Sequence, residues 1–425
     1  MSRFTTLLLA AMTVSSFVAC DKKNNKPSLE HDTLSNAVIL EWNDIAFQAI
    51  GGASNTHSLM NSRIYAMVHG AMFDAVNATN PLFKSFAYTG IDKGADPTVA
   101  AAVAAHHVLK SNLPAKADFL DSALNVLLAA TPNSPAKTAA MTSGVAAADA
   151  LLARGFNDNG NSDPIGQPAP ATKPGDYKNV PPFNFIFAPF WQDSKTFTLE
   201  GKGQFRCDPP PAVTSDVYTT AFNEVKATGK NNSPVRTPEQ TAYAKYWYEF
   251  SEVGWNRIAR IVATEKKTGL FQTARLFALL NFAMADAYIA GWDAKLHYNF
   301  WRPFTAIREA ANDLNAGTTP DETWEPAEPT PPIQDYPSTH SALGNAAATV
   351  LAFIYGDQTP FTMSSPTAMP ANSPRSFATF SEAANENADS RVRAGIHFRF
   401  ACEAGQELGS RIGDWTVTKA LTPLK

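Results

Sequence analysis

Apolar residues recur every three or four positions through most of the chain, which is the period of an amphipathic helix. Alanine-rich stretches such as VAAAVAAHHVLK favour helix by propensity. We find no run that alternates apolar and polar residues between hairpin turns, as strands do. The pattern therefore predicts an all-α protein, built as two packed helical bundles. The predicted helices cover 36–50, 58–77, 97–110, 116–130, 134–154, 237–264, 268–301, 340–355 and 373–418.

Two long segments interrupt this helical pattern. Residues 157–211 are rich in Gly, Pro, Asn and aromatic side chains, and residues 318–337 are rich in Pro and acids. Loops of this length are usually functional or linking. The first segment is interpreted as an aromatic strap that joins the two bundles, with a roof over a pocket as the alternative.

Three short blocks in the C-terminal third carry the candidate chemistry. They read KLHYNFWRP, YPSTHS and SRVRAGIH, and they contribute Lys295, Arg302, Ser338, His340, Arg391 and His397. Three cations at one point would repel each other, and a tetrahedral oxyanion would relieve that repulsion while accepting their hydrogen bonds. One histidine could then reach the central atom, and the other could move protons.

The spacing within the blocks favours convergence. Lys295 and Arg302 are seven residues apart and would share one face of a continuous helix, with Pro303 at a kink or helix end. Gly395 would break the helix after Arg391 and place His397 at the start of a new one, where the helix dipole favours an anion.

These blocks resemble the vanadium-dependent haloperoxidases and the acid phosphatases that share their site, in the type-2 phosphatidic acid phosphatase superfamily. The family pattern is K-x6-R-P, P-S-G-H and S-R-x3-G-x-H, and all three blocks occur in order between residues 290 and 405. The resemblance implies that Lys295, Arg302, Ser338 and Arg391 bind oxygens of vanadate or phosphate, together with the backbone N–H of Thr339.

The same resemblance implies the roles of the two histidines. His397 would be the ligand of vanadium, or the phosphate-accepting nucleophile of a phosphatase, and His340 would be the acid–base group. Two positions depart from the family pattern. Thr339 replaces the usual glycine, and a β-branched residue disfavours positive φ. Ala401 stands where an aspartate is common, so Glu403 or a backbone carbonyl would have to orient His397.

The leading hypothesis is a vanadate-dependent haloperoxidase that uses no haem and oxidises halide with hydrogen peroxide to hypohalous acid. In it, His340 assists proton transfer and Lys295 polarises the peroxide, so both act as catalytic residues beside His397. Ile333 lies seven residues before His340, where family members often line the halide pocket, and an aliphatic side chain there favours iodide or bromide. The alternatives are a phosphatase acting on a phosphate ester through a phosphohistidine, and a non-catalytic oxyanion-binding lipoprotein.

Composition and the N-terminus bear on location and partners. The net charge of −4 and the lack of a basic tract give no sign of nucleic-acid binding. Residues 1–19 resemble a lipoprotein-type signal peptide that ends at Cys20, with an ordinary secretory signal or a short anchor as the alternative. A polar tether over 20–35 and one domain over 36–425 would follow. These features predict the bacterial cell envelope, at the outer membrane, in the periplasm or secreted, with membrane attachment only through Cys20.

Several residues receive simpler interpretations. The apolar run 276–292 predicts a buried core helix, and His69 is interpreted as a core histidine. Asp286 and Asp293 are candidate buried partners of the cations. A disulfide between Cys207 and Cys402 stays open at this point, as does the oligomeric state.

Overall fold

A computed structural model describes residues 32–54, 57–155 and 162–424, and residues 32–425 form one compact unit. The predicted signal peptide, Cys20 and most of the tether lie outside the described residues. The predicted start of the domain at residue 36 stays a prediction. Within the described part, no helix is long and apolar enough to cross a membrane.

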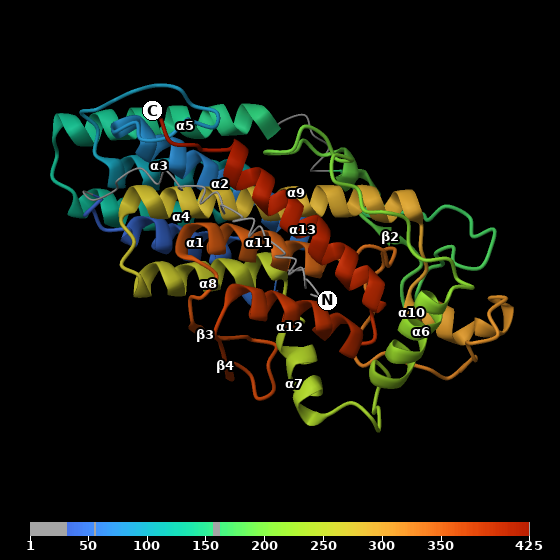
Figure 1. Ribbon diagram of the computed structural model, residues 1–425. Helices are drawn as coiled ribbons and strands as arrows, with labels where there is room; N and C mark the ends of the chain where they lie inside the picture. Colours follow the sequence, from blue (N-terminus) through green and yellow to red (C-terminus); the bar gives the residue numbers. More distant parts are fainter. Residues whose placement is uncertain (1–31, 55–56, 156–161, 425) are drawn as a thin grey trace, which may run out of the picture. The chain divides into compact units, whose positions relative to one another are not determined.

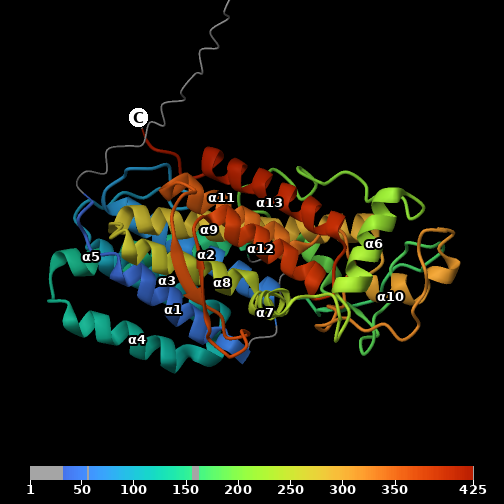
Figure 2. The same ribbon diagram turned by 60° about the horizontal axis from the view of Figure 1, so that its bottom comes forward.

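The fold is helical, as predicted, and one long helix lies at its centre. Helix α9 packs against α2 on one side and against α11 and α13 on the other (Figure 1). The first group of helices is α1 (Ala37–Ala49), α2 (Ser58–Thr79), α3 (Pro97–Asn112), α4 (Ala117–Ala130) and α5 (Pro135–Gly155). The second is α8 (Ser251–Glu265), α9 (Leu270–Tyr298), α11 (Thr339–Tyr355), α12 (Phe380–Arg393) and α13 (Arg399–Lys419). Helices α6 (Asp216–Thr228), α7 (Pro238–Tyr246) and α10 (Pro303–Arg308) complete the set, and α6 and α10 lie together at one end (Figure 2).

The composition of α9 explains its central place. Its residues are apolar around the whole circumference, and nearly all of those from Leu270 to Lys295 are buried. A helix that is hydrophobic on every face must be covered on every face. The predicted core helix over 276–292 is therefore confirmed. Helix α2 is covered in the same way, and its His69 is a core histidine whose Nε2 lies 2.8 Å from the Asn43 amide.

Helices α11 and α13 approach each other closely because α13 presents glycines to α11. A Cβ atom added at Gly409 would lie 2.0 Å from the Ala342 carbonyl oxygen, and one added at Gly405 would lie 2.2 Å from the Ser338 carbonyl oxygen. The Ser338 N–H also donates to the Ala401 carbonyl oxygen at 2.8 Å. These contacts fix the start of α11 against the start of α13, where two of the sequence blocks meet.

Buried aspartates fasten the long loop 162–211 to α9. The Asp286 carboxylate accepts the backbone N–H groups of Phe197, Thr198 and Leu199 at 2.7–3.1 Å. Asp293 forms a salt bridge to Arg206 at 2.7 Å. The hypothesis that these two aspartates neutralise the cationic cluster is therefore wrong, because both face the loop instead.

The same loop reaches the segments that follow α9. The Tyr177 N–H donates to the Asn299 carbonyl oxygen at 2.7 Å, and the Phe187 N–H donates to the Pro332 carbonyl oxygen at 2.8 Å. Short strands Ile165–Gly166 (β1) and Ile186–Phe187 (β2) pair within the loop. The loop thus holds both α9 and the chain just before Ile333.

Three predicted helices differ from the observed ones. The helix predicted over 237–264 is broken at 247–250 into α7 and α8, and the last predicted helix, over 373–418, is divided at Gly395 and shortened at its start. The first residues of that predicted helix instead form strand β4 (Pro374–Phe377), which pairs in an antiparallel hairpin with β3 (Phe361–Ser364). Pro374 disfavours a helix there, because it has no backbone N–H to donate. Helix α9 ends at Tyr298, since Asn299 is left-handed with φ 47°.

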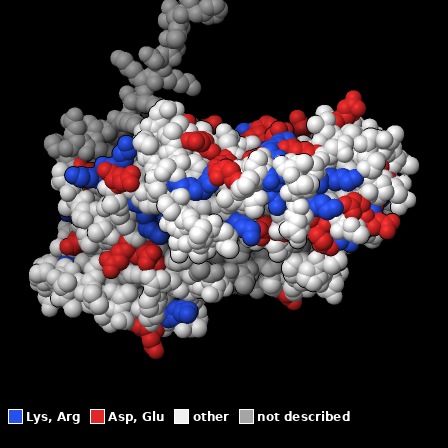
Figure 3. Space-filling model, turned by 90° about the horizontal axis from the view of Figure 1, so that it is seen from below, with Lys and Arg blue, Asp and Glu red and all other residues white. Residues whose placement is uncertain are grey.

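On the face of the molecule seen in Figure 3, side chains of both charges are interspersed.

The close approach of α11 and α13 generates a stability prediction. We expect Gly409→Ala to lower the free energy of unfolding by about 1–3 kcal/mol, because the new methyl group meets backbone that cannot move aside. Helix propensity alone would give a change of about 1 kcal/mol in the opposite direction. Gly201→Ala is the matched control, since an added Cβ there meets nothing within 4 Å. Urea unfolding followed by circular dichroism would measure both variants, and equal stabilities would contradict the packing.

Candidate functional site

The three sequence blocks meet where five helices begin or end. Lys295 lies in the last turn of α9, and Arg302 is the residue before Pro303 at the start of α10. Ser338 caps α11, Arg391 lies in the last turn of α12, and His397 lies in the linker before α13. The structure therefore brings these side chains together across more than one hundred residues of sequence.

Lys295 and Arg302 converge in a way that differs from the prediction. They do not share a helical face, because α9 ends at Tyr298 and Arg302 has an extended backbone with φ −85° and ψ 157°. The left-handed Asn299 turns the chain back instead, so that both cations point toward the loop 333–335. Gly395 has φ +80° and lies between the end of α12 and the start of α13, so it interrupts the helix as predicted.

All three cations are buried, with exposures of 0% for Lys295 and 1% for Arg302 and Arg391. Lys295 Nζ donates to the carbonyl oxygens of Gln334 at 2.7 Å and Asp335 at 2.9 Å. Burial, reinforced by Arg302, lowers the pKa of Lys295 well below its usual value. Burial lowers the pKa of Arg391 to about 10. The energetic cost of these charges is thus only partly offset by neutral acceptors.

Arg302 links the loop before α11 to His397. Its Nε donates to the Ile333 carbonyl oxygen at 2.7 Å, and its Nη1 donates to the Ile396 carbonyl oxygen at 2.7 Å. The same Nη1 lies 3.0 Å from His397 Nε2. It also lies 3.5 Å from His397 Nδ1, so the guanidinium lies against both ring nitrogens rather than in line with the lone pair of one.

Asp335 lies next to Nδ1 of the His397 ring. Its Oδ1 is 2.9 Å from His397 Nδ1 and 3.8 Å from Arg302 Nη1. Neither carboxylate oxygen has full hydrogen-bond alignment, yet at this distance in a buried site the attraction persists. Burial raises the pKa of Asp335 to about 7, against the lowering effect of Arg302 and Lys295. A carboxylate at this distance from Nδ1 favours the tautomer of His397 that carries its proton on Nδ1, in which Nε2 has the lone pair.

The expectation about what orients His397 needs correction. Glu403 is exposed on the outer face of α13 and does not contact the histidine, and the orienting group is the Asp335 carboxylate rather than a backbone carbonyl. The analysis of the sequence missed Asp335. Its one signal was its position directly before the YPSTHS block, in a loop already noted as rich in acids.

His340 lies at the edge of the cluster. Its Nε2 is 3.1 Å from the Glu249 carbonyl oxygen, which can only accept, so the ring proton lies on Nε2 and the lone pair on Nδ1. Some surface of His340 stays accessible, although the ring itself lies among protein atoms. Burial and the charge of Arg391 lower its pKa to about 3, and burial and Arg302 lower that of His397 well below its usual value. Both imidazoles are therefore neutral near pH 7.

The departure at Thr339 has a structural explanation. Thr339 is the first residue of α11 and is not among the residues with positive φ, so a side chain is tolerated there. Its methyl group fits against α9 because position 291 is glycine, where an added Cβ would lie 2.4 Å from Thr339 Cγ2. The Ser338 Oγ atom accepts from the N–H and the hydroxyl of Ser341, so it caps the first turn of α11 and keeps its own proton for donation.

An aromatic side chain, also missed from the sequence, covers the cluster. The Arg391 guanidinium lies 5.6 Å from the centre of the Tyr248 ring, a distance typical of a cation–π contact. Tyr248 is held by its hydroxyl, which donates to the Pro329 carbonyl oxygen at 2.7 Å. Tyr248 lies in the break between α7 and α8, where helical periodicity gives no information.

The cluster fits a tetrahedral oxyanion. Arg391 Nη2 is fully buried and has no hydrogen-bond partner among the described residues. Among the described residues, Asp335 is the only carboxylate in an ion pair with the three cations, and the N-terminal ends of α11 and α13 add positive potential. A dianion would satisfy the unpaired donor and offset the excess charge.

Four other residues singled out in the sequence can now be placed. Ile333, the predicted halide-pocket residue, is buried beside this cluster. Cys207 and Cys402 are both free thiols, and His297 is exposed on the outer side of α9.

Comparisons with known proteins agree with this geometry. Residues 275–425 match a family model of the VCPO second helical-bundle domain. A vanadium chloroperoxidase from Curvularia inaequalis is 27% identical over 296 residues, which cover 53% of this chain. The matched region spans about half (48%) of that relative's length.

Two solved structures resemble the whole described fold. The crystal structure of the first bacterial vanadium-dependent iodoperoxidase has a TM-score of 0.79 and 26% identity, covering 92% of this chain and 98% of that chain. An apo-type bacterial vanadium-dependent chloroperoxidase has a TM-score of 0.71 at 17% identity, covering 90% and 97%, and shows the likeness of fold alone. The resemblance to the vanadium haloperoxidases is thus confirmed, and so is the helical-bundle fold.

The charge imbalance generates a two-sided prediction for Arg391→Met. Without ligand, we expect this variant to unfold at a higher temperature than the parent, because an unpaired buried charge is removed while the packing stem remains. With orthovanadate or phosphate, the parent should gain about 2.7 kcal/mol at one hundred times the dissociation constant, and the variant much less. Calorimetric unfolding at matched ionic strength measures both effects.

Arg411→Met is the matched control, because Arg411 is exposed on α13 and pairs only loosely with Glu407. It should respond to the oxyanion as the parent does. If Arg391→Met gained as much stability from the oxyanion as the parent, the placement of the anion beside Arg391 would be wrong.

Proposed function

We propose that the chain is a vanadate-dependent haloperoxidase that oxidises halide with hydrogen peroxide. The observation that carries the proposal is a buried cluster of three cations beside the imidazole of His397, with one guanidinium nitrogen left unpaired among the described residues. The likeness to an iodoperoxidase over almost its entire length supports it. Vanadate, when bound, supplies a Lewis-acidic centre that activates peroxide without changing its own oxidation state.

The residues of the cluster would divide the work of binding. His397 is the proposed metal ligand, because its ring lies between Arg302 and Asp335, with Nε2 3.0 Å from Arg302 Nη1. Lys295, Arg302 and Arg391 would bind the oxygens, with the Ser338 hydroxyl and the Thr339 N–H as neutral donors. Asp335 would keep the proton of His397 on Nδ1 and so preserve the ligand lone pair.

His340 is the proposed acid–base group. In its neutral form the free lone pair is on Nδ1, since Nε2 donates to the Glu249 carbonyl oxygen. Nδ1 would accept a proton from peroxide as it enters the site and return it to the departing oxygen. A bound dianion would raise the low pKa of His340 toward neutrality, because it screens Arg391, Lys295 and Arg302. Lys295 would polarise the peroxide with the N–H that its two carbonyl partners leave free.

Iodide or bromide is the proposed halide. Ile333 is buried beside the cluster and offers no hydrogen bond to a halide, which favours a large, easily oxidised ion with weak hydration. The similarity to a protein described as an iodoperoxidase supports the same choice. We also propose attachment to the bacterial cell envelope through a lipid on Cys20, as the sequence VAC and the polar residues after it suggest.

The direct test is halide oxidation with and without added orthovanadate. Purified protein should form triiodide from iodide and hydrogen peroxide only after orthovanadate is added, and phosphate should compete because it has the same shape and charge. The reaction is followed by triiodide absorbance, with bromination of monochlorodimedone as the second halide. Hydrolysis of p-nitrophenyl phosphate without any vanadate-dependent oxidation would favour a phosphatase that uses the same site.

The two histidines should separate binding from turnover. His397→Ala should abolish vanadate binding, because it removes the only proposed protein ligand of the metal. His340→Ala should keep most of the affinity, since the cations remain, yet slow turnover by about 10²–10⁴-fold, as loss of an acid–base group does. Calorimetric titration with orthovanadate, followed by the triiodide assay, measures both.

His297→Ala is the control for this pair, because His297 is exposed and faces away from the cluster. It should match the parent in affinity and in rate. If His340→Ala lost vanadate as completely as His397→Ala, the division of roles would be wrong.

A further inference from the structure

Two buried polar side chains in the interior between α8, α11 and α12 have no hydrogen-bond partner among the described residues. They are Trp255 on α8, through its Nε1, and Asn387 on α12, through both atoms of its amide. Their exposures are 0% and 1%. Buried polar groups of native proteins are nearly always hydrogen-bonded, so these two side chains require a partner that the surrounding protein does not supply.

Gly344 of α11 leaves a small space in front of both side chains. A Cβ atom added at Gly344 would lie 3.4 Å from Trp255 Nε1 and 3.4 Å from Asn387 Nδ2, so both nitrogens border the same point. Those distances are ordinary contacts, whereas an added Cβ at Gly405 or Gly409 would meet backbone at 2.2 or 2.0 Å. Close helix packing therefore explains Gly405 and Gly409 but does not explain Gly344.

The chemistry of the space selects a water molecule as its ligand. The Trp255 N–H can only donate, and the Asn387 amide can donate or accept, depending on which of its atoms borders the space. Water suits both orientations of the amide, whereas a halide suits only one. A halide would also have to lose its hydration among neutral groups, which costs far more for an ion than for a neutral molecule. Buried waters typically bridge such otherwise unsatisfied groups.

The space lies one helical turn behind the anion cluster. Gly344 follows His340 by four residues on α11, and Asn387 precedes Arg391 by four residues on α12. Residues four apart share one face of a helix. The faces of α11 and α12 that border the space therefore carry His340 and Arg391 one turn further along.

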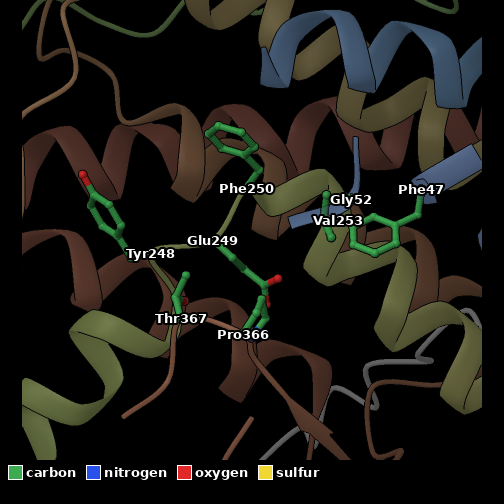
Figure 4. A pocket seen from close by; sticks show the side chains of 8 residues that line it. All are labelled: Phe47, Gly52, Tyr248, Glu249, Phe250, Val253, Pro366 and Thr367. Atoms are coloured by element: carbon green, nitrogen blue, oxygen red, sulfur yellow. The ribbon is translucent and has the colours of Figure 1, made fainter. Parts of the chain in front are cut away.

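The segment that leads into α8 contacts the same two residues. The Glu249 carbonyl oxygen accepts from His340 Nε2 at 3.1 Å, and the Tyr248 ring centre lies 5.6 Å from the Arg391 guanidinium. Figure 4 shows the Tyr248 and Glu249 side chains leaving this segment in different directions, with Glu249 extending toward Pro366 in the wall of a cavity. The position of α8 relative to α11 and α12 thus determines both contacts.

We propose that a buried water molecule binds between Trp255, Gly344 and Asn387, and that it holds α8 and α12 in place around α11. The water accepts from Trp255 Nε1 and bonds to the Asn387 amide, so it links two helices that have no direct hydrogen bond at this point. Gly344 is required because any side chain there would occupy the space of the water. The three residues are thus positioning residues for His340 and Arg391.

The direct test is a crystal structure of the protein without a bound oxyanion, from untreated crystals and from crystals soaked in sodium iodide. One ordered water should lie within about 3.2 Å of Trp255 Nε1 and of the Asn387 amide, with no anomalous signal from iodide at that point. A direct hydrogen bond between the two side chains, or no density between them, would overturn the water site. An iodide peak there would overturn it as well, in favour of a halide site.

Gly344→Ala tests the water through the sign of a stability change. The new methyl group meets Trp255 and Asn387 at ordinary contact distance, so helix propensity alone would raise the folding equilibrium constant by about fivefold. Displacing a water that satisfies two buried groups costs more than this gain, and the constant should instead fall at least about fivefold. Urea unfolding without oxyanion measures the change, and an increase would contradict the water.

Phosphate affinity tests the positioning role separately. Gly344→Ala should weaken phosphate binding at least about threefold in calorimetric titration, because Arg391 shifts relative to the other cations. Gly413→Ala is the matched control, since its added Cβ would lie 2.6 Å from Thr349 Cβ and loosen α11 against α13 away from the site. It should lose stability and keep the phosphate affinity of the parent.

Equal phosphate affinity in Gly344→Ala and the parent would overturn the positioning role. If the parent bound no phosphate while its crystals contained the water, the water site would stand, and the anion site with its positioning residues would be wrong.

Discussion

The buried charge imbalance between three cations and one carboxylate is the constraint on which the rest of the site depends. Lys295, Arg302 and Arg391 are shielded from water, and among the described residues Asp335 is the only carboxylate that forms an ion pair with any of them, while Glu328 acts on Arg391 without pairing with it. Burial alone would favour neutral forms of all these groups, as the lowered pKa of Lys295 and the raised pKa of Asp335 show. The surrounding fold must therefore supply acceptors for the cations in place of water.

Backbone carbonyls supply most of these acceptors, and this couples the cations to the path of the chain. The carbonyl oxygens of Ile333, Gln334 and Asp335 all accept from Lys295 or Arg302. These hydrogen bonds from the cations thus hold the loop before α11 in its conformation. The same bonds bring the Asp335 carboxylate next to His397 and place Ile333 beside the cluster. One set of contacts accordingly positions the cations, the orienting acid and the apolar residue proposed to face the halide.

The sequence predicted the helices, whose apolar residues recur at a regular spacing, and missed features of the irregular segments, which have no such spacing. Helices α1 to α5 and α11 lie within a few residues of their predicted ranges, because apolar spacing reports burial directly. The candidate residues were recognised because they lie in three spaced blocks, although a shared helical face was the wrong reason for Lys295 and Arg302 to meet. Asp335 and Tyr248 lie in irregular segments, where only the folded chain shows what each side chain contacts.

The two histidines show how identical side chains acquire different roles from their neighbours. Each is neutral, because burial and nearby cations lower both pKa values. A carbonyl oxygen fixes the proton of His340 on Nε2, whereas a carboxylate attracts the proton of His397 to Nδ1. The free lone pairs therefore lie on different ring atoms. Arg302 Nη1 lies 3.0 Å from His397 Nε2 and 3.5 Å from Nδ1, so one guanidinium nitrogen lies close to both ring nitrogens of His397. The neighbours of each ring, rather than the ring itself, thus separate the two histidines.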